Sequence, residues 1–253
     1  MKSRLVSCVF AAAMLTGCVN SGSLNEDGTR PDPLEGFNRT MFNFNYNYMD
    51  PYVVRPVAVV WRDYMPQPAR SGLSNFTSNL GEPASMVNNF LQGNIYDGFR
   101  HFNRFFVNTL LGMGGFMDVA GMSNDKLKKD YNKEFGQVLG HYNVPYGPYA
   151  VLPAYGSATV RDEGGGYVDY AYPVLSWLTF WGSVGKWTVE GIESRAQLLD
   201  QDQMLANSPD PYIFVREAYF QRHDFLANGG KIDEENNPNA EALKDQLDDI
   251  DSE

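Results

Sequence analysis

The sequence predicts a single, mainly α-helical domain that is interrupted by Gly- and Pro-rich segments. Apolar residues recur at spacings of three and four residues, the period of a helix, across most of residues 32–111 and 185–227. Residues 135–160 contain three prolines and four glycines, which a single helix cannot accommodate. The 253-residue chain without its first 17 residues has 236 residues, enough for one large domain with a substantial core.

The first 17 residues predict a secretory signal peptide that ends at a lipidation site. A basic start precedes an apolar run, residues 5–15, that is too short to cross a bilayer, since a crossing takes about 20 apolar residues. Residues 15–18 read Leu-Thr-Gly-Cys and resemble the bacterial lipobox, in which the chain is cut before a cysteine that becomes acylated. The alternative is a plain signal peptide with an incidental cysteine. We expect the mature chain to begin at Cys18, with residues 18–30 as a lipidated tether.

Composition limits the partners and the covalent stabilisation of the chain. Loss of the signal peptide removes Lys2 and Arg4 and moves the net charge from −11 to −13, so the mature chain is a poor candidate for binding nucleic acid. It also removes Cys8, and acylation of Cys18 leaves no thiol for a disulfide.

Val19 follows the cysteine. An aspartate there would resemble an inner-membrane retention signal, so an outer-membrane location is favoured.

Residues 32–50 predict the first helix, which should end near Asp50 because Pro51 follows. Aromatic and methionine side chains cover most of its surface, and a narrow polar stripe runs along it at spacings of four, four and three: Arg39, Asn43, Asn47 and Asp50. Such a helix is either buried in a core with a few satisfied asparagines or faces lipid or protein with its stripe along a wet passage. In the second case the stripe lines a channel, and Phe44 packs in the channel wall.

Four more helices are predicted in the first half of the chain, over residues 52–64, 69–80, 82–92 and 96–111. Three glycines end the last of them: Gly112, Gly114 and Gly115. Glycine permits backbone torsions that are closed to other residues, so this turn is either a hinge or a site of close packing.

The uncharged residues 135–160 predict loops with a hairpin of short strands. If the preceding glycines act as a hinge, Phe135 and Leu139 form an apolar gate on a moving loop of residues 131–146; a rigid turn with core side chains is the alternative. Residues 164–166 are three consecutive glycines and predict a mobile loop.

A second uncharged run, residues 170–185, contains two tryptophans. It is too short to span a bilayer, so we expect it to insert halfway at a membrane interface. Two helices then complete the domain of residues 31–230. They cover residues 185–199 and residues 209–227, the latter with Ser208 as its cap.

Residues 231–253 form an acidic tail of net charge −7 with a predicted short amphipathic helix. The apolar edge of this helix carries Leu243, Leu247 and Ile250 at spacings of four and three. Such an edge can enter a groove on a soluble partner, and the acidic side would steer a basic one. A solvated tail, or a tail docked on its own domain, is the alternative.

Motifs for catalysis and metal binding are missing from the sequence. His101, His141 and His223 have no metal-ligand spacing, so no metal and no cofactor are expected. The sequence has no G-x-S-x-G nucleophile elbow and no dinucleotide fingerprint, and we find no paired catalytic carboxylates. The expectation is therefore a protein that is not an enzyme.

Several stretches resemble the VacJ/MlaA family of outer-membrane lipoproteins. They are residues 32–39, 79–93, 104–121, 135–140, 147–149, 152–153, 161–162 and 210–224. These stretches are spread along the chain, and the resemblance covers essentially all of residues 32–230.

The resemblance implies a mostly helical ring, embedded among the inner-leaflet lipids of the outer membrane, with an amphipathic channel through it. Such a protein takes phospholipids that have strayed into the outer leaflet, associates with trimeric porins, and passes the lipid to a soluble periplasmic lipid-carrier protein, which maintains lipid asymmetry. The alternatives are an outer-membrane phospholipase, which the missing elbow disfavours, and a structural lipoprotein, which the long uncharged segments disfavour.

Replacement of Cys18 by Ser should abolish lipidation, because the hydroxyl cannot replace the acylated thiol of the lipobox. The variant should lack the acyl mass and should fail to reach the outer membrane. Intact-mass spectrometry of both proteins measures the N-terminus and the acyl chains. A wild-type N-terminus other than Cys18, or a wild-type protein without acyl mass, would contradict the prediction.

Overall fold

The computed structural model describes residues 30–230, and within them the mainly helical fold is confirmed. Cys18 and the tail residues Leu243, Leu247 and Ile250 lie outside the described residues, so the lipidation site and the tail helix stay predictions.

The described chain consists of α-helices, short 3-10 and π segments and one β-hairpin. The first half contains α2 (Glu35–Phe44), the π-helix η2 (Asn45–Val54), α3 (Arg55–Tyr64), α4 (Gln67–Leu91), α5 (Ile95–Leu111), α6 (Val119–Ser123) and η3 (Asp125–Leu127). The second half contains α7 (Phe135–His141), β1 (Tyr149–Leu152), β2 (Gly156–Thr159), α8 (Val160–Asp169), η4 (Leu175–Trp177), α9 (Phe180–Leu198), η5 (Leu199–Gln201), α10 (Asp202–Ala206) and α11 (Pro211–Ala227).

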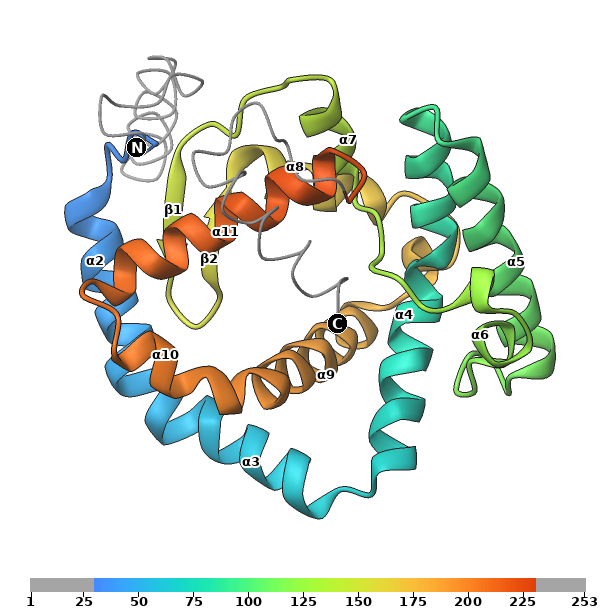
Figure 1. Cartoon of the computed structure of the whole chain (residues 1–253), viewed down its shortest axis with the longest axis horizontal. Helices are drawn as coiled ribbons and strands as arrows, with labels where there is room; N and C mark the ends of the chain where they lie inside the picture. The colour runs from blue at the N-terminus through green and yellow to red at the C-terminus, as the bar shows by residue number, and fades with distance from the viewer. Residues whose placement is uncertain (1–29, 231–253) are drawn as a thin grey trace, which may run out of the picture.

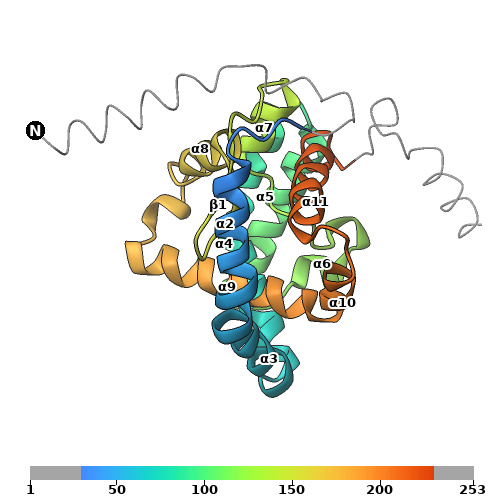
Figure 2. The ribbon, with the colours of Figure 1, turned by 90° about the vertical axis from the view of Figure 1, so that its left-hand side faces the viewer.

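The helices are arranged as a closed ring (Figure 1). The helices α2 and α3 form one side, α4 forms the opposite side, and α7, α8 and α11 lie between them along a third side. The pair α5 and α6 packs on the outside of α4. Seen edge-on, both ends of the described chain lie at the α7 edge, opposite α3 (Figure 2).

Pro51 does not end the first helix, contrary to the prediction. The backbone stays helical from Glu35 to Tyr64, through α2, η2 and α3, and Pro51 lies inside the π-helix. In the wide π turn the N–H of Arg55 donates to the carbonyl of Asp50, five residues earlier. This wider turn accommodates a proline, which lacks an N–H and would clash with the carbonyl four residues before it in an α-helix.

The two helices predicted over residues 69–80 and 82–92 are one continuous helix, α4, with Pro83 in its interior. An interior proline costs about 3 kcal/mol. Tertiary contacts made by α4 offset this cost. Around Pro83, the side chains of Glu82, Ser85 and Asn88 are fully buried and hydrogen-bonded to other segments.

Residues 135–160 contain the predicted hairpin and also a helix that was not predicted. Strands β1 and β2 pair antiparallel, with Tyr149 opposite Thr159 and Leu152 opposite Gly156. Phe135–His141 form α7 instead of a loop.

The prediction of a mobile loop at residues 164–166 is wrong, because these glycines lie within α8. Helices α7 and α8 cross closely enough that a Cβ added at Gly165 would lie 2.5 Å from the Cα of Gly136. Gly165 therefore serves helix packing. Gly164 and Gly166, by contrast, have open space where a Cβ would stand.

The last two long helices begin at other residues than predicted. α9 starts at Phe180, where the hydroxyl of Thr179 accepts from the N–H of Gly182. α11 is capped by Asp210 and not by Ser208, since the Asp210 carboxylate accepts from the N–H groups of Tyr212 and Ile213.

Replacement of Gly165 by Ala should destabilise the fold by about 1–3 kcal/mol, because the new methyl group overpacks the crossing of α7 and α8. Replacement of Gly166 by Ala in the same helix should be neutral or stabilising by up to about 1 kcal/mol, since its Cβ meets nothing and alanine favours helix. Thermal unfolding of both variants tests this. Equal stability of the two variants would contradict the proposed close packing.

Candidate functional site

The outer face of the ring is apolar over much of its surface. Along α5 the exposed side chains form one face that consists of Ile95, Phe99, Phe102, Phe106 and Leu110. At the start of α9, Trp177, Phe180 and Trp181 are each more than 70% exposed. In residues 30–230 we find no helix with the length and hydropathy needed to cross a bilayer. Large exposed apolar faces of this kind mark contact with lipid or with another protein.

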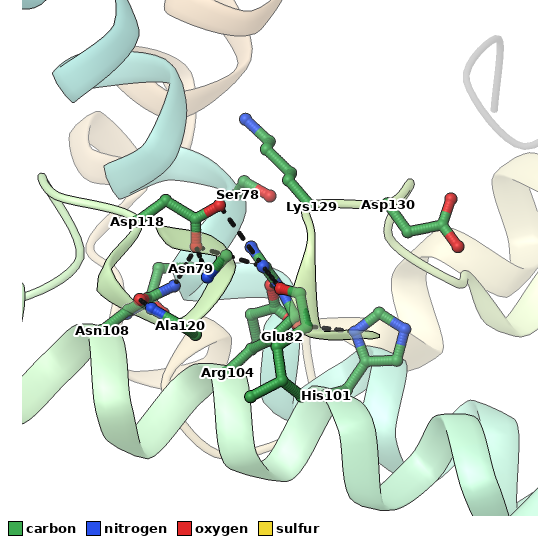
Figure 3. Close-up of polar contacts among 12 residues, drawn as sticks. Ser78, Asn79, Glu82, His101, Arg104, Asn108, Asp118, Ala120, Lys129 and Asp130 are labelled. Carbon is green, nitrogen blue, oxygen red and sulfur yellow. Dashed lines mark hydrogen bonds and ion pairs between the residues drawn. The ribbon is translucent and has the colours of Figure 1, made fainter. Parts of the chain in front are cut away.

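The interior, in contrast, contains a buried charged cluster between α4 and α5 (Figure 3). The Glu82 carboxylate is 1% exposed. It accepts from Nε of Arg104 at 2.8 Å and lies 2.5 Å from Nδ1 of His101. A buried ion pair of this kind is stable only when its remaining polar atoms are also paired.

The rest of the cluster supplies those partners. Arg104 also donates to the carboxylate of Asp118 and to the carbonyl of Leu127, and Asn108 donates to Asp118 at 2.9 Å and accepts from the N–H of Ala120 at 2.9 Å. The cluster thereby joins α4, α5, α6 and η3, and its role is structural. No group of three or more His, Cys, Asp or Glu residues suited to a metal ion occurs in the described part of the chain.

The ends of the predicted polar stripe are tied to other elements. Arg39 forms a two-fold contact with Asp210, at 3.1 and 2.8 Å. Asp50 forms another with Arg195 of α9, at 2.7 and 2.8 Å. These ion pairs connect the continuous helix of residues 35–64 to the last third of the chain, so both stripe ends help to close the ring.

The middle of the stripe is exposed. Neither Asn43 nor Asn47 has a side-chain hydrogen bond within residues 30–230. Phe44 is 41% exposed and stacks on Tyr48, with ring centroids 6.4 Å apart. Whether these residues line a channel stays a prediction.

Two asparagines outside the stripe, missed at the sequence level, hold the hairpin against α2 and η2. Asn38 is fully buried, donates to the carbonyl of Tyr149 at 3.1 Å and accepts from the N–H of Val151 at 2.9 Å. Asn45 binds the backbone of Leu152 and Ala154 in the same way, at 2.8 Å each. An asparagine among large apolar residues was the only sequence signal for this contact.

The glycines predicted as a hinge form a hydrogen-bonded turn after α5. Gly114 and Gly115 have φ of 73° and 104°, in the left-handed region that favours glycine. Gly115 packs on Asn79, and Gly112 packs against the backbone of Asn108 and Met117. The turn is therefore closely packed, and its role as a hinge stays a prediction.

The predicted gate residues lie on α7. The N–H of Phe135 donates to the carboxylate of Asp169 at 2.9 Å, and both Phe135 and Leu139 are partly buried. Their function as a gate likewise stays a prediction.

Glu134 and Lys129 are two exposed charged residues between η3 and α7. The surrounding protein raises the pKa of Glu134 to about 7, mainly by burial and then by the charge of Asp169. Burial likewise lowers the pKa of Lys129. Both side chains nevertheless remain accessible to water, which screens part of these shifts.

Partly buried His223 and buried Asp162 are the only histidine–aspartate pair among residues 30–230, with Nδ1 and Oδ2 3.3 Å apart. Burial lowers the pKa of His223. Within residues 30–230, no serine, threonine or cysteine side chain is hydrogen-bonded to a histidine. The hydroxyl of Thr159 binds Asp162 instead, at 2.8 Å. The cluster joins β2, α8 and α11, and it lacks the arrangement of a nucleophile activated by a base.

Large exposed apolar faces on a helical fold define the class of protein that contacts a lipid surface or another protein. Comparison with known proteins agrees with this class of protein and identifies its family. The family model described as "MlaA lipoprotein" matches residues 30–226. The chain belongs to the MlaA lipoprotein family, as the sequence motifs predicted.

The relatives span the full length of the chain. The Shigella flexneri and Escherichia coli proteins named "Intermembrane phospholipid transport system lipoprotein MlaA" are each 65% identical over 253 residues, 100% of both chains. The Haemophilus influenzae protein of that name is 40% identical over 98% of each chain. A solved structure from work on the "Structural basis for maintenance of bacterial outer membrane lipid asymmetry" is 71% identical, with a TM-score of 0.77, and covers 78% of this chain and 100% of that chain.

Replacement of Glu82 by Ala should destabilise the protein by about 3–5 kcal/mol, because Arg104 would then be left buried without its main partner. As a control, Asp125→Ala removes an ion pair with Lys128 whose side chains are 88% and 70% exposed, and should cost about 0–1 kcal/mol. Chemical denaturation measures both values. A loss below about 1 kcal/mol for Glu82→Ala would show that the cluster does not hold α4 against α5.

Proposed function

We propose that this chain is an outer-membrane lipoprotein that removes mislocalised phospholipids from the outer leaflet through a channel inside the ring. It passes them to a soluble periplasmic carrier and so maintains lipid asymmetry. The observation that carries the proposal is the closed helical ring with exposed apolar faces and a charged cluster buried in its wall, in a chain 65% identical over its whole length to named phospholipid-transport lipoproteins.

The surface of the ring supports an embedded position. The exposed faces of α3 and α5 and the aromatic start of α9 are chemically matched to lipid. Trp177 and Trp181 suit the headgroup level, where tryptophan rings are enriched. The acyl chains on Cys18 anchor the protein on the periplasmic side, and several chains together make such an anchor stable.

Lipid headgroups pass through the interior of the ring in this proposal. The exposed stripe residues Asn43 and Asn47 line the passage, Phe44 packs in its wall, and Phe135 and Leu139 act as the gate. The protein acts by binding and guiding lipid, without catalysis.

Two partners complete the proposal. A trimeric porin associates with the apolar outside of the ring, and the carrier binds the acidic tail through Leu243, Leu247 and Ile250. Both ends of the described chain lie at one edge of the ring.

Deletion of Asn43 and Phe44 together tests the channel. Two residues correspond to a rotation of about 200° in a helix. Because the helix is continuous from Glu35 to Tyr64, Arg39 can keep Asp210 while Asp50 turns away from Arg195. The stripe is then misplaced, and transfer of labelled phospholipid in proteoliposomes should be abolished or become uncontrolled.

The matched control is Asn43→Ala, which leaves the register unchanged and should keep most of the activity. Wild-type transfer by the deletion variant would exclude this channel. Release of fatty acid or lysophospholipid by the wild-type protein would instead support the phospholipase alternative.

A further inference from the structure

The turn of the β-hairpin carries an aromatic side chain that stacks on α9. The rings of Tyr155 and Trp187 are nearly parallel, with planes 4° apart and centroids 5.9 Å apart. Tyr155 is 46% exposed and Trp187 is 50% exposed, so this pair is not part of a buried core. Figures 1 and 2 both show the hairpin between α8 and α9, with its turn on the side of α9. The stack therefore joins two elements at an accessible place.

Two other contacts connect the hairpin and α9 to η2. The side chain of Asn45 binds the hairpin backbone at Leu152 and at Ala154, at 2.8 Å each. Further along η2, the carboxylate of Asp50 accepts from the guanidinium group of Arg195 at 2.7 and 2.8 Å. The π-helix is thus fixed to the hairpin at one point and to α9 at another.

Together these three contacts close a frame that consists of η2, the hairpin turn and α9. The α9 side of the frame runs from Trp187 to Arg195, which is about 12 Å along the helix axis. On the η2 side, Asn47 lies between the contacts of Asn45 and Asp50, and its side chain has no hydrogen bond within residues 30–230. Asn47 is one of the residues proposed to line the passage, so the frame borders that passage.

The aromatic stack is the corner of the frame that separates most easily. The other two corners are a two-fold ion pair and two hydrogen bonds to the backbone. A stack of two rings adds only modestly to the burial of those rings, and here each residue is about half exposed.

The anchors of α9 lie toward its other end. Glu193 accepts from the indole N–H of Trp61 at 2.6 Å, and Arg195 binds η2. In contrast, the stack is the only hydrogen bond, ion pair or aromatic contact by which a side chain of residues 180–187 meets another element of the described chain. Tyr155 also has a second partner, since its hydroxyl donates to Glu163 of α8 at 2.6 Å. Separation of the rings therefore leaves Tyr155 held on α8.

We propose that this stack is a latch that closes the passage beside Asn47, and that a phospholipid parts Tyr155 and Trp187 as its acyl chains pass. The ring faces that the stack covers then become apolar surface for the chains, while the headgroup follows the polar side of the passage at Asn47. The inference rests on the proposed transport function and adds to it the contact that must open.

A reversible cross-link across the stack tests the latch. In the full-length, lipidated protein the variant Tyr155→Cys/Trp187→Cys has two free thiols, because Cys8 is removed and Cys18 is acylated. A bifunctional methanethiosulfonate joins these thiols, and dithiothreitol releases them. Transfer of labelled phospholipid in proteoliposomes should fall by about tenfold or more on cross-linking, as for a lid that is held shut. Transfer should return on reduction of the same sample, which excludes misfolding as the cause of the block.

A second aromatic stack provides a matched control. Phe76 of α4 stacks on Phe116 of the turn after α5, with ring centroids 4.8 Å apart, and neither residue belongs to the frame. The variant Phe76→Cys/Phe116→Cys should transfer lipid equally well before and after the same cross-link.

Removal of one ring tests the contact without a cross-link. Tyr155→Ala should raise the rate of transfer by about fivefold, which corresponds to about 1 kcal/mol, because the latch no longer closes. Tyr155→Phe keeps the ring, loses only the bond to Glu163, and should keep the wild-type rate. Thermal unfolding should show that both variants are folded.

Three results would overturn the latch. They are unchanged transfer by the cross-linked pair, an equal block by the cross-linked control pair, and a wild-type rate for folded Tyr155→Ala. In each case the wild-type protein still transfers phospholipid, so the proposed function stands without the latch. A wild-type protein that transfers no phospholipid overturns both.

Discussion

Two ion pairs fix the register in which one long helix meets distant parts of the chain. Arg39 binds Asp210 ahead of α11, and Asp50 binds Arg195 of α9. The two carboxylate–guanidinium contacts lie eleven residues apart on a helix that stays continuous only because η2 accommodates Pro51. Each contact is two-fold, which fixes direction as well as distance. The helical register between them is therefore constrained, and any change in it must break one contact.

The ring also inverts the usual distribution of polarity. Charged and amide side chains such as Glu82, Arg104 and Asn88 are almost completely buried, while long apolar side chains on α5 and α9 are exposed. In water this arrangement would expose large apolar faces. At a lipid surface the same faces are matched to their surroundings, and the interior can carry charge. The buried cluster then rigidifies the wall made by α4 and α5, since each of its members depends on the others for hydrogen bonds.

Several glycines that the sequence predicted to be mobile are instead held by close backbone packing. Gly165 lets α8 approach α7, and Gly115 packs on Asn79 of α4. In both places the small residue serves contact between elements. The irregular segments lie between these contacts, and one of them brings Lys129 to Ser74 of α4.

The sequence by itself determined the helical class, the lipobox, the β-hairpin and the family, because each depends on local chemistry or on short motifs. It also identified the exposed, uncharged segment before α9. The local rules failed at Pro51, Pro83 and Gly165, where each predicted a break. A π turn accommodates Pro51, and contacts with other elements keep the helix at Pro83 and Gly165. The pairing of Arg39 with Asp210 and of Lys129 with Ser74 was decided only by the tertiary structure. These partners are far apart in the chain. The periodicity of a helix does not indicate which distant group each of its side chains will contact in the folded ring.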